Sequence, residues 1–100
     1  PLKAKGLRSL GNVFRAIGAL KQSQEILEQS LAVAQRSQSS QDISAALLSL
    51  GNTARARADI PTALRLYQQA SEAAVLESDR IQAQLNQLSL LVEITQTRRG

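Results

Sequence analysis

A four-residue sequence, Ser-Leu-Gly-Asn, occurs twice in this chain, at residues 9–12 and again 40 residues later at residues 49–52. The same offset relates similar residues elsewhere, among them Leu7 and Leu47, Arg15 and Arg55, Ala16 and Ala56, Leu20 and Ile60, Ile26 and Leu66, Leu27 and Tyr67, and Gln29 and Gln69. A third copy begins at Ser89-Leu90. Repeated units of this length stack so that each contacts only its neighbours. The repeat therefore predicts a layered array.

Apolar residues within each unit follow the period of an α-helix. Leu7, Leu10, Phe14 and Ile17 are three or four residues apart, as they would be on one helix face. Leu, Ala and Gln, which favour helices, are frequent, and Pro occurs only at positions 1 and 61. We therefore expect an all-α fold of about five helices, near residues 3–17, 20–36, 42–57, 60–77 and 80–97.

Polar residues, Gly and Pro mark the expected helix boundaries. Gly18-Ala19 separates the first two helices, and the Ser/Gln-rich residues 37–41 indicate a loop. Asp42 is suited to be an N-cap or a first-turn acid of the third helix. Residues 59–61, Asp-Ile-Pro, form a strong start signal, because Asp can accept from free backbone N–H groups and Pro needs no partner in a first turn. Asp79 is expected to start the fifth helix as Asp59 starts the fourth.

Small and large residues alternate in a recognisable order. The second unit reads Leu50-Gly51, Ala54, Ala63, Tyr67 and Ala70, and the first reads Leu10-Gly11, Phe14, Ser23, Leu27 and Ser30. This order resembles the tetratricopeptide repeat, in which small residues let paired helices approach closely and large ones fill the space between them. The first unit departs from it at Ser23 and Ser30, where Ala is usual, and at Leu27, where Tyr is usual. HEAT and armadillo repeats share the period but not this spacing.

The resemblance implies a right-handed α–α superhelix of antiparallel helix hairpins that forms one domain over residues 1–100. Its units would span residues 3–40 and 42–79, with the first helix of a third unit at 80–97. The 40-residue form with Leu-Gly-Asn is similar to repeats of cell-polarity scaffolds and of bacterial, especially cyanobacterial, multidomain proteins. Because the chain begins with Pro rather than Met, we expect it to be a piece of a longer array.

In this family the first helix of each unit lines a concave, ligand-binding surface, so the resemblance implies a protein–protein interaction scaffold. It places Arg8, Asn12, Arg15, Asn52 and Arg55 in the peptide-binding groove. An Asn amide can both donate to and accept from a peptide group, and a guanidinium suits a carboxylate. The expected partner is therefore a peptide or helical segment of another protein, with acidic residues. Two alternatives stay open: the Asn residues could instead join neighbouring helices, and the arginines could be solvated.

Composition argues against catalysis. The chain has no Cys and no His, which removes thiol nucleophiles, the commonest general base and the usual ligands of zinc. We therefore expect no enzyme activity, no cofactor and no metal site. Apolar runs are too short to span a membrane, and we expect a cytoplasmic protein.

The net charge of +4 leaves nucleic acid as an alternative partner. Residues 1–21 carry five basic side chains and no acidic one. Phe14 and Tyr67 are the only aromatic residues, so platforms for base stacking are missing and nucleic acid is the less favoured partner. A continuous basic stripe over both units would favour nucleic acid, whereas isolated arginines beside Asn12 and Asn52 would favour a peptide.

The fifth helix has no second helix after it to complete its hairpin. Leu85, Leu88 and Val92 are expected to face back into the stack, and the residues left with partial cover are Leu90, Leu91 and Ile94. Since terminal repeats normally present a polar outer face, this apolar surface predicts a weak homodimer through the C-terminal helix. A further alternative function is therefore that of a self-association module in a larger multidomain signalling protein.

Overall fold

A computed structural model describes residues 2–99 of the chain, and the side chains of residues 2–97; Pro1 and Gly100 lie outside the described residues. Five helices follow one another: α1 (Leu2–Ala16), α2 (Leu20–Arg36), α3 (Ser40–Ala56), α4 (Ile60–Ala73) and α5 (Glu77–Arg99). Residues 2–99 contain no strand. The expected all-α fold of five helices is confirmed, with α3 starting two residues earlier, and α4 ending four residues earlier, than the sequence indicated.

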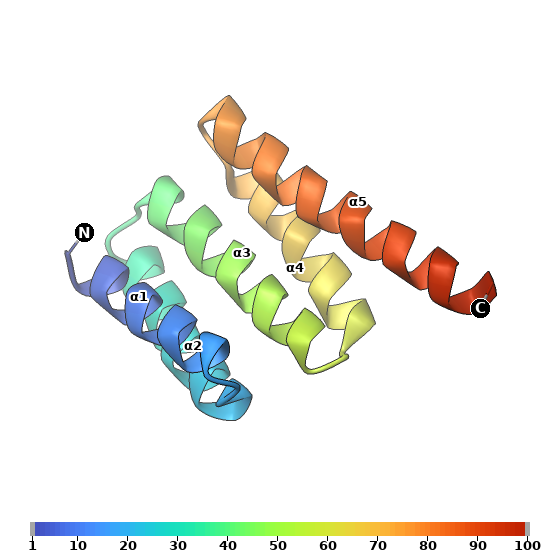
Figure 1. Cartoon of the computed structure of the whole chain (residues 1–100). Helices are drawn as coiled ribbons and strands as arrows, with labels where there is room; N and C mark the ends of the chain where they lie inside the picture. The colour runs from blue at the N-terminus through green and yellow to red at the C-terminus, as the bar shows by residue number, and fades with distance from the viewer. Residues whose placement is uncertain (1, 100) are drawn as a thin grey trace.

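The helices form two antiparallel hairpins, α1–α2 and α3–α4, and α5 lies beside the second hairpin (Figure 1). Helix α3 occupies the centre and packs against each of the other four. Helices α1, α3 and α5 form one row, and α2 and α4 lie behind it in Figure 1. The described part of the chain measures 44 × 30 × 17 Å, as expected for a short stack rather than a sphere.

Three of the four connections between helices have the same turn geometry, and these three turns are spaced 20 residues apart. The N–H groups of Ala19, Ser39 and Asp59 donate to the carbonyl oxygens five residues earlier, at 2.8, 3.1 and 2.9 Å. The residues just before them, Gly18, Gln38 and Ala58, have φ values of 84°, 54° and 62°. This left-handed residue after the last helical turn satisfies carbonyl groups that the helix leaves unpaired. The expected loop at 37–41 is therefore shorter, because this turn needs only residues 37–39.

The three acidic residues expected at helix starts have different outcomes. Asp59 caps α4 by accepting from the Thr62 N–H at 3.4 Å, as predicted. The cap of α3 is Ser39, which accepts from the Asp42 N–H at 3.3 Å, so Asp42 takes the second of its two expected roles, in the first turn. The predicted start at Asp79 is wrong. Ala74 adopts an extended conformation that ends α4 early, and α5 begins at Glu77, with Asp79 inside its first turn.

Within each hairpin the two helices touch where a glycine faces a large side chain. A Cβ added to Gly51 would lie 2.6 Å from Cε1 of Tyr67, and one added to Gly11 would lie 2.5 Å from Cγ of Leu27. Leu27 and Tyr67 are completely buried. The close approach expected from the spacing of small and large residues is confirmed.

Buried hydroxyls explain the two serines that replace the usual Ala in the first unit. Ser30 donates to the Ala4 carbonyl at 2.7 Å, and Ser23 donates to the Gly11 carbonyl at 2.8 Å, so each links α2 to α1. In the second unit Ser44 of α3 donates to the Ala70 carbonyl of α4 at 2.9 Å. Ser44 stands at the position of Ala4, and Ala70 at that of Ser30, so the same bridge is made from the opposite helix.

The orientation of α5 differs from the expectation. Leu85, Leu88 and Val92, expected to face the stack, are exposed. Leu90, expected to be partly covered, is completely buried against α4 with Ala63 and Tyr67. The reason is that α4 packs against the side of α5 that carries Leu90, which is equivalent to the buried Leu50 of α3.

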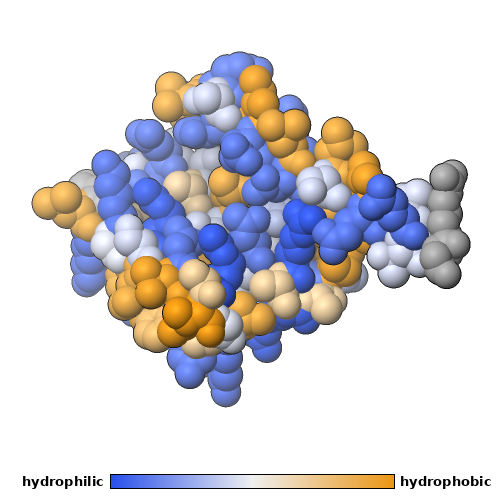
Figure 2. All heavy atoms as spheres, viewed as in Figure 1, coloured by the Kyte–Doolittle hydropathy of each residue, from blue (hydrophilic) through white to orange (hydrophobic). Residues whose placement is uncertain are grey.

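Apolar residues are exposed at both ends of the stack. Figure 2 shows them at the lower left, over α1, and along the outer edge of α5 at the upper right, with polar residues between. The exposed apolar residues of α1 include Leu10, Val13 and Ile17. Leu10 is 45% exposed, whereas its equivalents Leu50 and Leu90 are 6% and 0% exposed, because α2 and α4 lie beside them. No helix among residues 2–99 combines the length and hydropathy needed to cross a bilayer.

Candidate functional site

All five predicted binding residues lie on the α1 and α3 parts of the row formed by α1, α3 and α5, which we call the α1–α3–α5 face. Each is half-buried. A hollow of about 190 Å³ opens between the three helices near their starts. Its lining comes from α1 (Lys5 and Arg8), α3 (Gln41, Asp42, Ser44, Ala45 and Leu48) and α5 (Asp79 and Gln82).

Arg8 reaches across from α1 to α3. Its Nη1 lies 3.5 Å from Oδ1 of the buried Asp42, so the guanidinium forms one wall of the hollow while it contacts the carboxylate. Burial raises the pKa of Asp42, but hydrogen bonds that include those with Ser39 and Arg8 outweigh it, and the pKa is lowered. Asp42 therefore stays ionised inside the interface between the two units.

Asn12 and Arg15 interact within α1. Nη1 of Arg15 donates to Oδ1 of Asn12 at 3.0 Å, across one helical turn. This contact orients the Asn12 amide so that its nitrogen points away from the guanidinium. In the described part of the chain no carboxylate lies within ion-pair distance of Arg15.

Asn52 joins three helices. Its amide oxygen accepts from the Tyr67 hydroxyl of α4 at 2.6 Å and from the Asn86 amide of α5 at 3.1 Å. Burial raises the pKa of Tyr67, and the Arg55 guanidinium offsets part of that rise, so the phenol remains protonated and can donate. The two bonds fix the amide of Asn52. No acceptor among the described residues lies within hydrogen-bond distance of its nitrogen.

Arg55 links α3 to α5. Its Nη2 donates to the Ser89 hydroxyl at 3.4 Å and forms an ion pair with Glu93. The hydrogen bond with Glu93 raises the pKa of Arg55, and burial opposes that rise. Arg15 and Arg55, equivalent in the repeat, thus have different partners: Arg15 contacts its own helix and Arg55 contacts the next unit.

Apart from the Arg55–Glu93 pair, which is 38 residues apart, the polar side-chain contacts between neighbouring first helices share a sequence separation of 34 residues. Arg8 with Asp42, Asn52 with Asn86, and Arg55 with Ser89 all show it. Asp42, Asn86 and Glu93 were not among the predicted site residues, although each contacts one of them. An opposite charge 34 residues after Arg8 is the one sequence signal that could have revealed Asp42.

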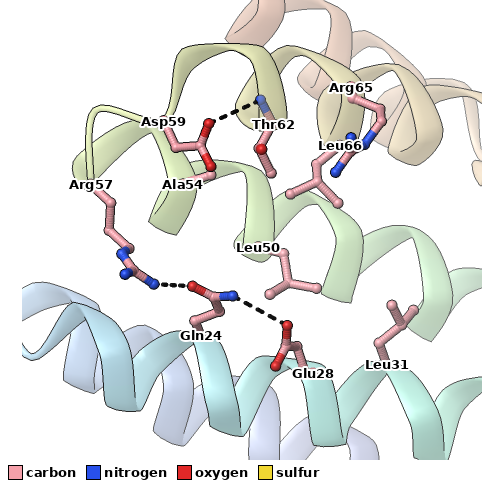
Figure 3. A pocket seen from close by; sticks show the side chains of 10 residues that line it. All are labelled: Gln24, Glu28, Leu31, Leu50, Ala54, Arg57, Asp59, Thr62, Arg65 and Leu66. Carbon is pink, nitrogen blue, oxygen red and sulfur yellow. Dashed lines mark hydrogen bonds between the residues drawn. The ribbon is translucent and has the colours of Figure 1, made fainter.

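A larger hollow of about 600 Å³ lies on the other side of α3, between α2 and α4 (Figure 3). Leu31, Leu50 and Leu66 point into it, and acidic, basic and uncharged polar residues surround them. Arg57 donates to Gln24, and Gln24 donates to Glu28 at 3.3 Å, so hydrogen bonds tie part of its rim together. None of the predicted site residues lines this hollow.

Comparison with known proteins identifies a family for most of the chain. A family model described as tetratricopeptide repeat matches residues 3–74, which include helices α2, α3 and α4 and all but the first residue of α1. The match ends before α5. No protein of curated function and no solved structure matches the chain.

Proposed function

The chain belongs to the tetratricopeptide-repeat family, and from its geometry we propose that the α1–α3–α5 face binds a peptide or helical segment of another protein. Repeats of this family mediate protein–protein interactions and are typically scaffolds rather than enzymes. The proposed contacts are Arg8, which lines the hollow between α1, α3 and α5, and Asn12, Arg15, Asn52 and Arg55, which lie further along α1 and α3 and do not line it.

The observation that carries this proposal is the orientation of Asn52. Its amide oxygen already accepts two hydrogen bonds, from Tyr67 and Asn86. The amide nitrogen is the group left to contact a ligand, and it can donate to a backbone carbonyl of an extended segment. An amide fixed in this way needs no reordering when a peptide binds, which lowers the entropic cost of association.

Charge on the same face supports a peptide over nucleic acid. Arg8 contacts Asp42, and Arg55 pairs with Glu93, so these arginines are locally compensated and do not continue one basic stripe. Arg15, which contacts an amide instead of a carboxylate, keeps its positive charge for a ligand. We therefore propose that the bound segment carries an acidic residue opposite Arg15.

Peptides selected from a random displayed library against the 100-residue chain would test this proposal. The informative variant is Asn52→Asp, which keeps an oxygen acceptor for Tyr67 and Asn86 but removes the amide donor. We expect this change, and Asn12→Ala, each to weaken the selected peptide about tenfold. The control is Gln68→Ala, an exposed amide on α4. Equal affinities of wild type, Asn52→Asp and Asn12→Ala, with unchanged helicity, would contradict the site.

Self-association is a second proposed function, and the exposed apolar residues of α5 are the observation that favours it. A second copy that covers them would remove apolar surface from water, which is the main favourable contribution to association. Sedimentation equilibrium of the chain over a range of concentrations tests it. A monomeric mass at every concentration would contradict it.

A further inference from the structure

The exposed side of α5 carries a regular row of aliphatic residues. Ile81, Leu85, Leu88 and Val92 are separated by four, three and four residues, and each is between 45% and 58% exposed. This spacing is that of the a and d positions of a heptad, with Leu85 and Val92 at a and Ile81 and Leu88 at d. We call these four residues the α5 seam.

Uncharged residues flank the α5 seam. The positions beside it, which would contact a second helix at its edges, hold Gln82, Gln84, Ser89 and Leu91. Charged residues at these edge positions commonly set partner choice in paired helices. Here an identical helix can approach without repulsion between like charges.

The side chain of Leu91 is too large for a second helix to cover α5 in the way that α2 covers α1 and α4 covers α3. It stands at the repeat position of Gly11 and Gly51, where even a Cβ would lie 2.5–2.6 Å from the large residue of the second helix. A second helix in the same register would therefore meet the Leu91 side chain. Whatever covers α5 has to pack differently from the second helix of a regular unit.

Charge along α5 distinguishes the two possible directions of pairing. The first turn of the helix holds Glu77 and Asp79, and Arg80 next to them donates to Glu77 at 2.8 Å. A parallel pair would bring these acidic starts of the two copies together and would align the two helix dipoles. An antiparallel pair separates the two acidic starts and opposes the dipoles.

We infer that the α5 seam pairs antiparallel with the α5 seam of a second copy of the chain. Ile81 then packs opposite Val92 of the second copy, and Leu85 opposite Leu88 of the second copy, which gives four aliphatic layers. Leu91 lies at the edge of the pair. This inference rests on the proposed self-association and defines how the two copies meet. None of the proposed peptide contacts lies in the seam, so substitutions in the seam leave those side chains unchanged.

Sedimentation equilibrium of single variants tests the location. Leu88→Glu puts a charge into an aliphatic layer, so we expect the dissociation constant of the dimer to rise at least about tenfold while helicity is unchanged. The matched control is Leu10→Glu, the same substitution at an exposed leucine of α1, which should leave the dimer intact. A dimer that survives Leu88→Glu, or that Leu10→Glu weakens equally, would overturn the seam but not self-association. A monomeric wild type would overturn both.

Disulfide formation tests the direction, since the chain has no native cysteine. Ile81→Cys mixed with Val92→Cys should give a cross-linked heterodimer. Ile81→Cys alone should not cross-link, because in an antiparallel pair the two copies of position 81 are about 16 Å apart along the helix, well beyond disulfide reach. Efficient cross-linking of Ile81→Cys with itself would show a parallel pair and overturn the inference.

Discussion

The Tyr67 hydroxyl donates to the amide oxygen of Asn52 at 2.6 Å, and thereby joins the residue that fills the α3–α4 hairpin to a residue of the proposed binding face. Tyr67→Phe keeps the buried ring and removes the hydroxyl that makes this bond. We expect it to cost about 1 kcal/mol, a typical contribution of one hydrogen bond, and to lower the melting temperature by about 4–8 °C. A double-mutant cycle with Asn52→Ala should show the coupling; additive effects of the two changes would contradict it.

Gly51 is expected to tolerate no larger residue. Gly51→Leu would place a side chain where even a Cβ lies 2.6 Å from Tyr67, which is itself completely buried. We expect a loss of about 3 kcal/mol or more, measured by urea unfolding. Gly6→Ala is the control, because nothing lies within 4 Å of a Cβ at Gly6, and a helical Gly→Ala change should stabilise by about 0.5–1 kcal/mol. An unchanged unfolding midpoint for Gly51→Leu would refute the close-packing argument.

The turn at Ala58 offers a stabilising substitution. Ala58 has a φ of 62°, a conformation that glycine adopts without steric cost and that costs an L-residue about 1–2 kcal/mol. Part of the gain is lost to the greater freedom of glycine in the unfolded chain, so we expect Ala58→Gly to stabilise by about 0.5–1 kcal/mol. The reverse change at the equivalent turn, Gly18→Ala, should destabilise by a similar amount. Thermal unfolding followed by circular dichroism would decide, and a lower melting temperature for Ala58→Gly would contradict the prediction.

Stability at low pH should depend on Asp42. Its pKa is lowered from the usual value of 3.8, so the folded state favours the ionised form. The resulting stabilisation is complete well above pH 3.8 and is lost as the pH falls through the folded-state pKa below 3.8. We expect Asp42→Asn to cost about 1.5–3 kcal/mol at neutral pH, as for a hydrogen-bonded charged group, and progressively less in strong acid. If the difference in unfolding free energy between wild type and Asp42→Asn stays constant as the pH is lowered, the prediction is wrong.

Sequence predicted the packing inside each hairpin better than the contacts between hairpins. The close approach of Gly51 and Tyr67 follows from residue size and residue spacing, and the sequence states both properties directly. The bond between Asn52 and Asn86 follows instead from the axial shift between neighbouring first helices, which gives a separation of 34 residues rather than the 40 of the repeat. No local pattern encodes that shift, so the interhelical partners of the site were missed.

The sequence alone could not predict which face of α5 packs against the stack. Leu85, Leu88 and Val92 have helical spacing, and so do Ala83, Leu90 and Ile94. Both rows are apolar, so periodicity alone allows either to be buried. Packing against α4 buries Leu90 and leaves the first row exposed.

The serine bridges make the hairpin, rather than the single helix, the smallest part of this array that can be exchanged. In the first unit Ser30 of α2 supplies the hydroxyl to Ala4, and in the second unit Ser44 of α3 supplies it to Ala70. A chimaera of α1 with α4 would face Ala4 with Ala70 and have no hydroxyl at this contact. The reciprocal chimaera of α3 with α2 would place two hydroxyls there. Grafted or shuffled units should therefore be joined at residues 37–39, between the hairpins, and never at residues 17–19 or 57–59.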